Sequence, residues 1–287
     1  MLNYRKYIGA VLVSGFIAIA GLTVGCEDTS VAPIAPKQKP VKGKPFAQQA
    51  PARSALPRTL RKHEAGKILL EGKKLYSQNN EELIIRDFFN DRRGGFFLDI
   101  GAASAIFNST TYYLEERLGW RGIGVDALPR YGPRWAEKRP KSLFVNYAIS
   151  DKSGETMTFY EHDWPEVSSL SKEQASQFGG EEKLTEVEVK TITLNDLLEK
   201  YGVNKVDHLT IDIEGAEMFA LNGFDIERYK PDLICIEAHT RGKQGEDEIR
   251  GYFEAHGYEL LKEYLRHDIP NWYFAPVSAS EPATPAS

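Results

Sequence analysis

Cysteine and methionine are scarce in this chain of 287 residues, which has two Cys and three Met. Cys26 ends an apolar N-terminal stretch and Cys235 lies in a second apolar run, so a disulfide within the folded part is excluded unless two chains pair. The sequence also lacks a basic cluster in its folded part and has a net charge of -5, which argues against a nucleic-acid partner. No internal repeat has the spacing of a solenoid.

The first 26 residues have the pattern of an export or anchoring segment. Arg5 and Lys6 precede an uncharged, mostly apolar stretch over 7–25, which stops at Cys26. Residues 22–26 (LTVGC) resemble a bacterial lipoprotein processing site, in which the cysteine becomes lipidated. The alternative is an uncleaved membrane helix, because the stretch is nearly long enough to span a bilayer. In either case the basic end is expected to stay in the cytoplasm.

Composition divides the rest of the chain into three parts. Residues 27–56 are rich in Pro, Ala, Lys and Gln and have too few large apolar side chains for a core, which predicts a flexible tether. Residues 278–287 contain Ser, Ala, Pro, Thr and Glu and predict a disordered tail. The segment between them, 57–277, has a length and composition that suit one globular domain.

Strand-like and helix-like segments alternate through this domain. Helices are predicted over 59–76 and 81–90 at its start, and buried strands over 96–100, 122–125, 142–149, 208–213 and 233–238. Strands separated by helices predict a mainly parallel sheet that is covered on both faces. The last two apolar segments, 258–265 and 272–276, predict an antiparallel pair at one edge.

One stretch organises the domain: residues 96–108 read FFLDIGAASAIFN. A buried strand ends at Gly101, small residues form a turn, and a helix follows, which is the geometry with which α/β folds bind nucleotides. Asp126 ends the next strand, where an acidic side chain can accept hydrogen bonds from both hydroxyls of a ribose. The alternatives are a core strand whose glycine only makes a turn and an exposed turn aspartate. The second and third glycines of a nicotinamide-dinucleotide fingerprint are missing.

Four blocks, in order, resemble those of the FkbM-type methyltransferases: 97–102 (FLDIGA), 119–126 (GWRGIGVD), 206–217 (VDHLTIDIEGAE) and 231–237 (PDLICIE). The resemblance implies an S-adenosylmethionine-dependent enzyme. It also implies the class I methyltransferase fold, an α/β architecture with a mainly parallel seven-stranded sheet and helices on both faces.

The resemblance also implies a set of cofactor-binding residues. They are Asp99, Gly101, Ala102, Asp126, Ala148 and Ser150. The first three would form the turn beside the methionine moiety, the fourth would hold the ribose, and the last two would border the adenine.

The block over 206–217 lies where a methyl acceptor would approach. Asp212 and Glu214 alternate as in a strand and are expected to face the same way, and Glu217 follows. These carboxylates are candidates to orient an acceptor hydroxyl, to bind a divalent metal or to cap the following helix. His239 is the candidate catalytic base because imidazole titrates near neutral pH, with a surface turn histidine as the alternative. A metal site formed by Asp212, Glu214 and His239 has no closed ligand signature.

Two positions in the turn depart from the family pattern: Ala103 stands where relatives usually carry Asn, and Ala105 where they usually carry Gly. A positive φ at Ala105 would cost on the order of 1 kcal/mol and crowd the cofactor. Asn195 stands where relatives usually carry Asp.

The sequence therefore predicts a methyltransferase that O-methylates a sugar or another small polar metabolite, tethered to a membrane by residues 1–26. S-adenosylmethionine is cytoplasmic, so an exported domain would be separated from it. The domain is then expected on the cytoplasmic side, or it is an exported lipoprotein with a catalytically silent methyltransferase-like fold that binds a glycan or a nucleoside-like ligand.

Overall fold

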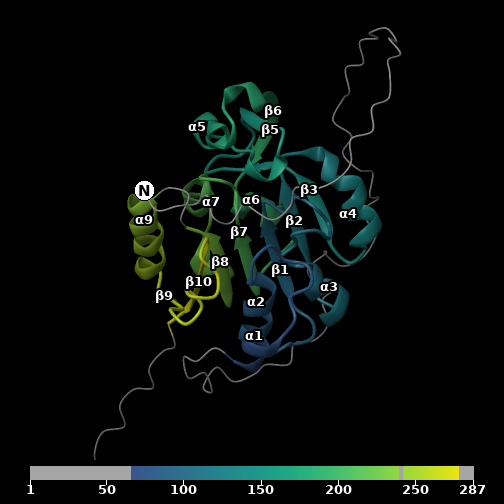
Figure 1. The fold of residues 1–287 in the computed structure, drawn as a ribbon, viewed down its shortest axis with the longest axis vertical. Coiled ribbons are helices and arrows are strands. Elements are labelled where there is room, and N and C mark those ends of the chain that lie inside the picture. The colour runs from purple at the N-terminus through teal and green to yellow at the C-terminus, as the bar shows by residue number, and fades with distance from the viewer. Residues whose placement is uncertain (1–65, 239–241, 278–287) are drawn as a thin grey trace, which may run out of the picture. The chain divides into compact units, whose positions relative to one another are not determined.

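A computed structural model describes residues 66–238 and 242–277 (Figure 1). The segments predicted as membrane anchor, tether and tail lie outside these residues, and so does His239. Within the described part, none of the helices has both the length and the apolar character that crossing a bilayer requires.

A seven-stranded sheet forms the centre of the domain, as the resemblance predicts (Figure 1). Its strands, in spatial order, are β3 (Leu143–Asn146), β2 (Arg121–Asp126), β1 (Phe96–Ile100), β7 (His208–Ile211), β8 (Leu233–Glu237), β10 (Asn271–Pro276) and β9 (Tyr258–Leu260). The first five are parallel, whereas β10 is antiparallel to both β8 and β9. The predicted fold class is therefore confirmed, together with the antiparallel edge.

Helices cover both faces of this sheet. One face packs against α6 (Leu194–Lys200), α7 (Glu217–Asn222), α8 (Ile226–Tyr229) and α9 (Gly242–Ala255). The other face packs against α1 (Lys67–Glu71), α2 (Glu81–Phe89) and α3 (Tyr112–Leu118). The period of two along β1 explains this arrangement, since Phe96, Leu98 and Ile100 belong to the first core and Phe97 to the second.

Three predicted elements are wrong in part. The edge strand expected over 258–265 extends only over Tyr258–Leu260. Of the helix expected over 59–76, the described portion is helical only over Lys67–Glu71, and it ends at Gly72. The residues that follow are not helical. The N–H of Tyr76 donates to the side-chain carboxylate of Glu82 (2.9 Å) and not to a main-chain carbonyl one turn earlier. The strand expected over 142–149 is broken at Tyr147, where the chain leaves the main sheet.

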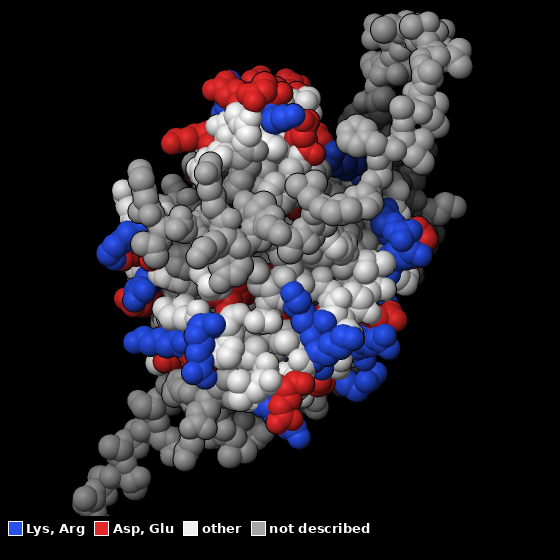
Figure 2. Space-filling model, in the orientation of Figure 1, with Lys and Arg blue, Asp and Glu red and all other residues white. Residues whose placement is uncertain are grey.

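After the break, β4 (Ala148–Ile149) pairs with β6 (Leu184–Ile192), which pairs with β5 (Thr156–His162). Strands β5 and β6 and helix α5 (Lys172–Ala175) belong to an insertion over residues 151–192, which lies beyond one end of the main sheet (Figure 1). Side chains alternate along β6, with Glu186 and Glu188 exposed and Val189 buried. Asp and Glu gather over the insertion on the face drawn in Figure 2, so its outer surface is acidic.

Candidate functional site

A pocket opens at the carboxyl ends of β1, β2 and β7, where open parallel sheets bind their ligands. Its empty space is about 610 Å³, including the part that is open to solvent. Five of the residues predicted from the sequence line it: Gly101, Asp126, Ala148, Asp212 and Glu214. The insertion closes another side through Phe159, Pro165 and Leu170. The fold thus brings separate blocks of the sequence to one cavity.

The turn over residues 101–105, called the first turn below, follows β1 closely. Gly101 has a φ of 83°, and a Cβ at this position would lie 1.8 Å from the backbone oxygen of Asp212, so only glycine fits. The N–H groups of Gly101 and Ala102 both donate to the carbonyl of Val125 (3.0 Å each). The turn is therefore tied to β2 and to the loop after β7.

The departure at Ala105 has a different consequence from the one expected. The positive φ in this part of the turn falls at Ala103 (36°) and not at Ala105. Ala105 is fully buried and packs with Ala102 and Trp135, away from the pocket. A left-handed backbone costs alanine on the order of 1 kcal/mol, and asparagine tolerates it better. The strain thus lies at the position where relatives usually carry asparagine.

Asp126 holds the strained residue in place. Its Oδ2 accepts the N–H of Ala103 (2.9 Å), and its Oδ1 accepts the N–H of Leu128 (2.8 Å). Each carboxylate oxygen has a further lone pair, so Asp126 can still accept a hydroxyl donor in the pocket. Burial raises its pKa to about 6, against the two N–H donors, which favour the charged form.

Three other predicted cofactor residues do not line the pocket. Asp99 accepts a 2.5 Å hydrogen bond from the hydroxyl of Thr111 and is buried. Ala102 is buried in the cluster around Trp135. Ser150 is buried as well, and its N–H donates to the carbonyl of Ile192 (3.1 Å). Their predicted contacts with a cofactor remain predictions.

Asp212, Glu214 and Glu237 form a group of carboxylates, called the acid group below. Their ligand atoms all lie within 4.8 Å of one another. Asp212 is accessible to solvent, whereas Glu214 and Glu237 are half-buried. No ion pair joins the acid group to a lysine or arginine within residues 66–238 and 242–277. Oxygen donors of this kind suit Mg²⁺ or Ca²⁺, and three such donors leave a coordination sphere open.

The acid group carries fewer charges at neutral pH than its composition implies. Burial and then repulsion from Glu217 raise the pKa of Asp212 to about 7, and burial and then repulsion from Asp212 raise that of Glu214 to about 9. The pKa of Glu237 also lies well above its usual range, and Glu237 shares a hydrogen bond with Asp212. Asp212 is exposed to solvent and lines the pocket, so its carboxyl is accessible to a ligand there.

Glu217 shapes the loop that carries the acid group. It is completely buried, and its Oε1 accepts the N–H groups of Ile213 (3.2 Å) and Gly215 (3.1 Å). Both N–H donors belong to the loop that precedes α7, so the carboxylate of Glu217 stabilises this loop. Glu214 has a φ of 52° within this loop, an uncommon value for a residue other than glycine that is often found at functional sites.

The insertion also contacts this loop. The hydroxyl of Ser169 donates to the carbonyl of Glu214 (2.8 Å), and Ser169 is fully buried. A Cβ at Gly215 would lie 2.9 Å from the side chain of Gln174, so the insertion packs tightly here. The strained position of Glu214 is thus supported from a segment far away in the sequence.

Sequence reasoning missed one member of the acid group. Glu237 ends the buried strand β8 and is not among the site residues predicted from the sequence. A charged residue at the carboxyl end of an apolar strand next to β7 was the available signal. His239 lies outside the described residues, so its place near the acid group stays a prediction.

Comparison with known proteins agrees with this geometry. The model of the methyltransferase FkbM domain matches residues 99–260. One solved structure that matches is a TehB-like SAM-dependent methyltransferase from Corynebacterium glutamicum, with 16% sequence identity and a TM-score of 0.38, covering 71% of this chain and 90% of the other. No curated protein matches. Because the family model spans more than half of the sequence and includes the first turn, the acid group and the strands between them, the chain belongs to the FkbM methyltransferase family.

Proposed function

We propose that this protein transfers a methyl group from S-adenosylmethionine to a hydroxyl of a sugar or another small polar metabolite. The observation that carries the proposal is that Gly101, Asp126, Asp212 and Glu214 all line one pocket. Family membership implies the cofactor. The acceptor is inferred from the polar character of the acid group, since several carboxyls can hydrogen-bond to hydroxyl donors.

The residues present fit S-adenosylmethionine. Gly101 and Asp126 line the pocket at the carboxyl ends of β1 and β2, where open parallel sheets bind nucleotides. Asp126 offers acceptor oxygens for a ribose diol, and the apolar wall includes Val125 and Ile149. When bound, the cofactor supplies an electrophilic methyl group on a positively charged sulfur.

The acid group would prepare the acceptor. Asp212, with a pKa of about 7, suits a base that takes the hydroxyl proton near neutral pH. Glu214, with a pKa of about 9, remains protonated and donates a hydrogen bond. The alternative is a divalent cation held by the acid group, which would lower the pKa of the acceptor hydroxyl. Transfer that persists in EDTA supports the first arrangement, and transfer restored only by Mg²⁺ or Ca²⁺ supports the second.

Calorimetric titration of the full chain with S-adenosylmethionine and with its demethylated product tests the proposal without the acceptor. We expect micromolar binding, and a weakening of at least about tenfold in Asp126→Ala, because a charged acceptor and the support of Ala103 are lost together. Asp247→Ala, an exposed residue on α9, is the control and should bind as the wild type does. Absence of binding by folded wild-type protein would overturn the proposal.

A catalytically silent binding protein is the second candidate. Both oxygens of Asp126 already accept main-chain N–H groups, and Asp99 is turned toward Thr111, which favours a scaffold that has lost the cofactor. Under this alternative, folded protein binds a glycan or a nucleoside but neither S-adenosylmethionine nor its product.

We further propose that residues 1–26 attach the protein to a bacterial membrane, with Cys26 as the lipidated residue. Incorporation of labelled palmitate that is lost in Cys26→Ala supports a lipoprotein. Digestion of the domain by protease added to intact spheroplasts places it outside, and resistance until lysis places it beside the cytoplasmic cofactor.

A further inference from the structure

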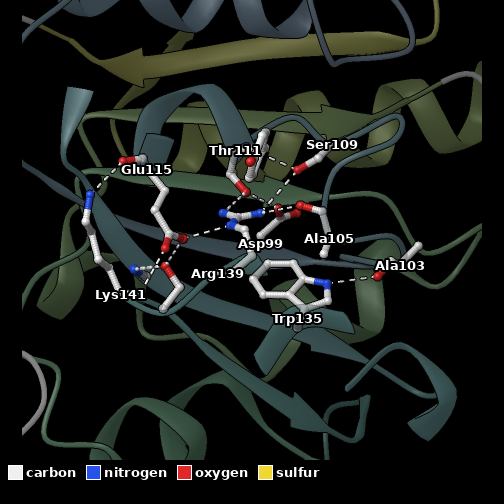
Figure 3. A network of polar contacts seen from close by, with 12 residues as sticks. Asp99, Ala103, Ala105, Ser109, Thr111, Glu115, Trp135, Arg139 and Lys141 are labelled. Carbon is white, nitrogen blue, oxygen red and sulfur yellow. Dashed lines mark hydrogen bonds and ion pairs between the residues drawn. The ribbon is translucent and has the colours of Figure 1, made fainter. Parts of the chain in front are cut away.

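Arg139 is the largest charged side chain that the fold buries completely (Figure 3). It follows α4 (Gly132–Lys138), and its Nε donates to Glu115 on α3 (2.7 Å). Its Nη2 donates to the hydroxyl of Thr111 (3.1 Å), which in turn donates to Asp99. The guanidinium also lies over the ring of Trp135, 4.2 Å from its centroid. Arg139 therefore links the end of β1 to the start of α3.

The same arginine reaches the first turn. Its Nη1 donates to the carbonyl of Ala105 (3.3 Å), and the indole Nε1 of Trp135 donates to the carbonyl of Ala103 (2.9 Å; Figure 3). Asp126 accepts the N–H of Ala103 from the pocket side. Three side chains from two elements beyond β1 thus fix a turn whose second alanine has a left-handed backbone.

The packing of Trp135 is specified by a glycine on β2. A Cβ at Gly124 would lie 2.4 Å from the indole ring, so the ring can lie against the strand only because position 124 has no side chain. Gly124 belongs to the block GWRGIGVD, which ends at Asp126. The same short segment therefore provides the acceptor on the pocket side and the space for the donor on the other side.

We propose that Arg139 and Trp135 are positioning residues for cofactor binding, which fix the backbone of Ala103 and Ala105 without contacting the ligand. Neither side chain lines the pocket. The inference rests on the proposed function, because it concerns the cofactor side of the same site. It also assigns Asp99 a partner, since its carboxylate supports Arg139 through Thr111.

The chain offers matched controls for both residues. Arg86 is a nearly buried arginine that pairs with Glu82 and lies over the ring of Tyr113. Neither of these partners belongs to the first turn. Trp120 is buried, rests against a glycine and donates its indole N–H to the carbonyl of Arg92 (2.7 Å). Arg86→Lys and Trp120→Phe therefore remove similar interactions from the core without touching the turn.

The test compares Arg139→Lys and Trp135→Phe with these controls in the full chain, by calorimetric titration with S-adenosylmethionine and by thermal unfolding. We expect affinity to fall about fivefold in Trp135→Phe, which loses one hydrogen bond to the turn, and about tenfold or more in Arg139→Lys, which loses several. The controls are expected to lose thermal stability but to bind as the wild type does. Wild-type affinity in folded Arg139→Lys and Trp135→Phe would overturn the inference and leave the proposed function intact.

A spectroscopic readout separates positioning from general loosening. In a ¹⁵N-labelled sample, the indole N–H resonance of Trp135, assigned with Trp135→Phe, should shift when S-adenosylmethionine binds, because its acceptor is the turn itself. The resonance of Trp120 should stay in place. Equal shifts of both signals, or none in Trp135 on binding, contradict the proposed coupling. If the wild type does not bind the cofactor at all, the proposed function fails, and the inference fails with it.

Discussion

Two groups of carboxylates in this domain have different surroundings. Asp99 and Glu115 lie in the core around one buried cation, Arg139, and most of their oxygens accept hydrogen bonds. Asp212 and Glu214 of the acid group line the pocket, and no lysine or arginine pairs with the acid group within the part of the chain that the structure describes. One region pairs its carboxylates with a buried cation, and the other places two of its carboxyls in the wall of the pocket.

This difference shows what each region can do. A charge that is buried with a hydrogen-bonded counter-ion fixes one geometry, because moving either partner exposes the other to an apolar surrounding. Carboxyls that repel one another retain protons near neutral pH and can exchange them, which is what acid–base chemistry requires. Raised pKa values of about 7 at Asp212 and about 9 at Glu214 are consistent with the second role.

The largest expected effect comes from removing the cation. Arg139→Met leaves Glu115 buried without its counter-ion, so the free energy of unfolding should fall by about 3 to 5 kcal/mol. Glu237→Gln in the acid group replaces a carboxyl whose pKa is raised well above its usual range, chiefly by burial, with a neutral amide, and it should leave stability unchanged or raise it. Urea denaturation at pH 7 measures both. A loss below about 1 kcal/mol in Arg139→Met would remove the contrast between the two regions.

The sequence predicted the pocket side of this comparison better than the core side. Gly101, Asp126, Asp212 and Glu214 follow buried strands in short blocks, so position along the strand was enough to bring them to one edge of the sheet. Arg139 follows a short helix, and its partners come from elements distant in the sequence. No local pattern separates such an arginine from a solvated one.

Backbone strain was predicted in the right turn but at the wrong residue. The departure at Ala105 suggested crowding there, whereas the left-handed φ falls at Ala103 and Ala105 packs against Trp135. Which alanine adopts the left-handed backbone depends on where Asp126 and Trp135 form hydrogen bonds with the main chain. These contacts form only after β2 and α4 have packed.

An intermediate effect is expected from the pH dependence of stability in Glu214→Gln. The pKa of Glu214 in the folded protein, about 9, lies above its ordinary value of 4.5, so the folded state binds this proton more tightly. The resulting stability is present at low pH and is lost as the pH rises toward 9. Glutamine does not ionise, so the variant should become more stable than the wild type with rising pH, by at most about 1.4 kcal/mol per pH unit.

Urea denaturation at pH 6 and pH 9 measures this difference. Glu182→Gln, on the exposed side of the insertion, provides the control and should follow the wild type at both values. A constant difference between Glu214→Gln and wild type across the range would mean that Glu214 is charged throughout, and the acid group would then resemble the core region in being compensated.

The smallest expected effect is that of Ser169→Ala. Its hydroxyl is the link from the insertion to the carbonyl of Glu214, and a single neutral hydrogen bond contributes about 1 kcal/mol. The loss in overall stability should therefore be near 1 kcal/mol, but hydrogen exchange at the amides of Gly215 and Ala216 should accelerate, because the strained loop loses its outside support. Ser176→Ala removes a hydroxyl elsewhere in the insertion that donates to Glu173 and should leave these amides unchanged. If exchange in Ser169→Ala matches wild type, the loop is held by Glu217 alone, and the acid group depends on its own buried carboxylate as the core region depends on Arg139.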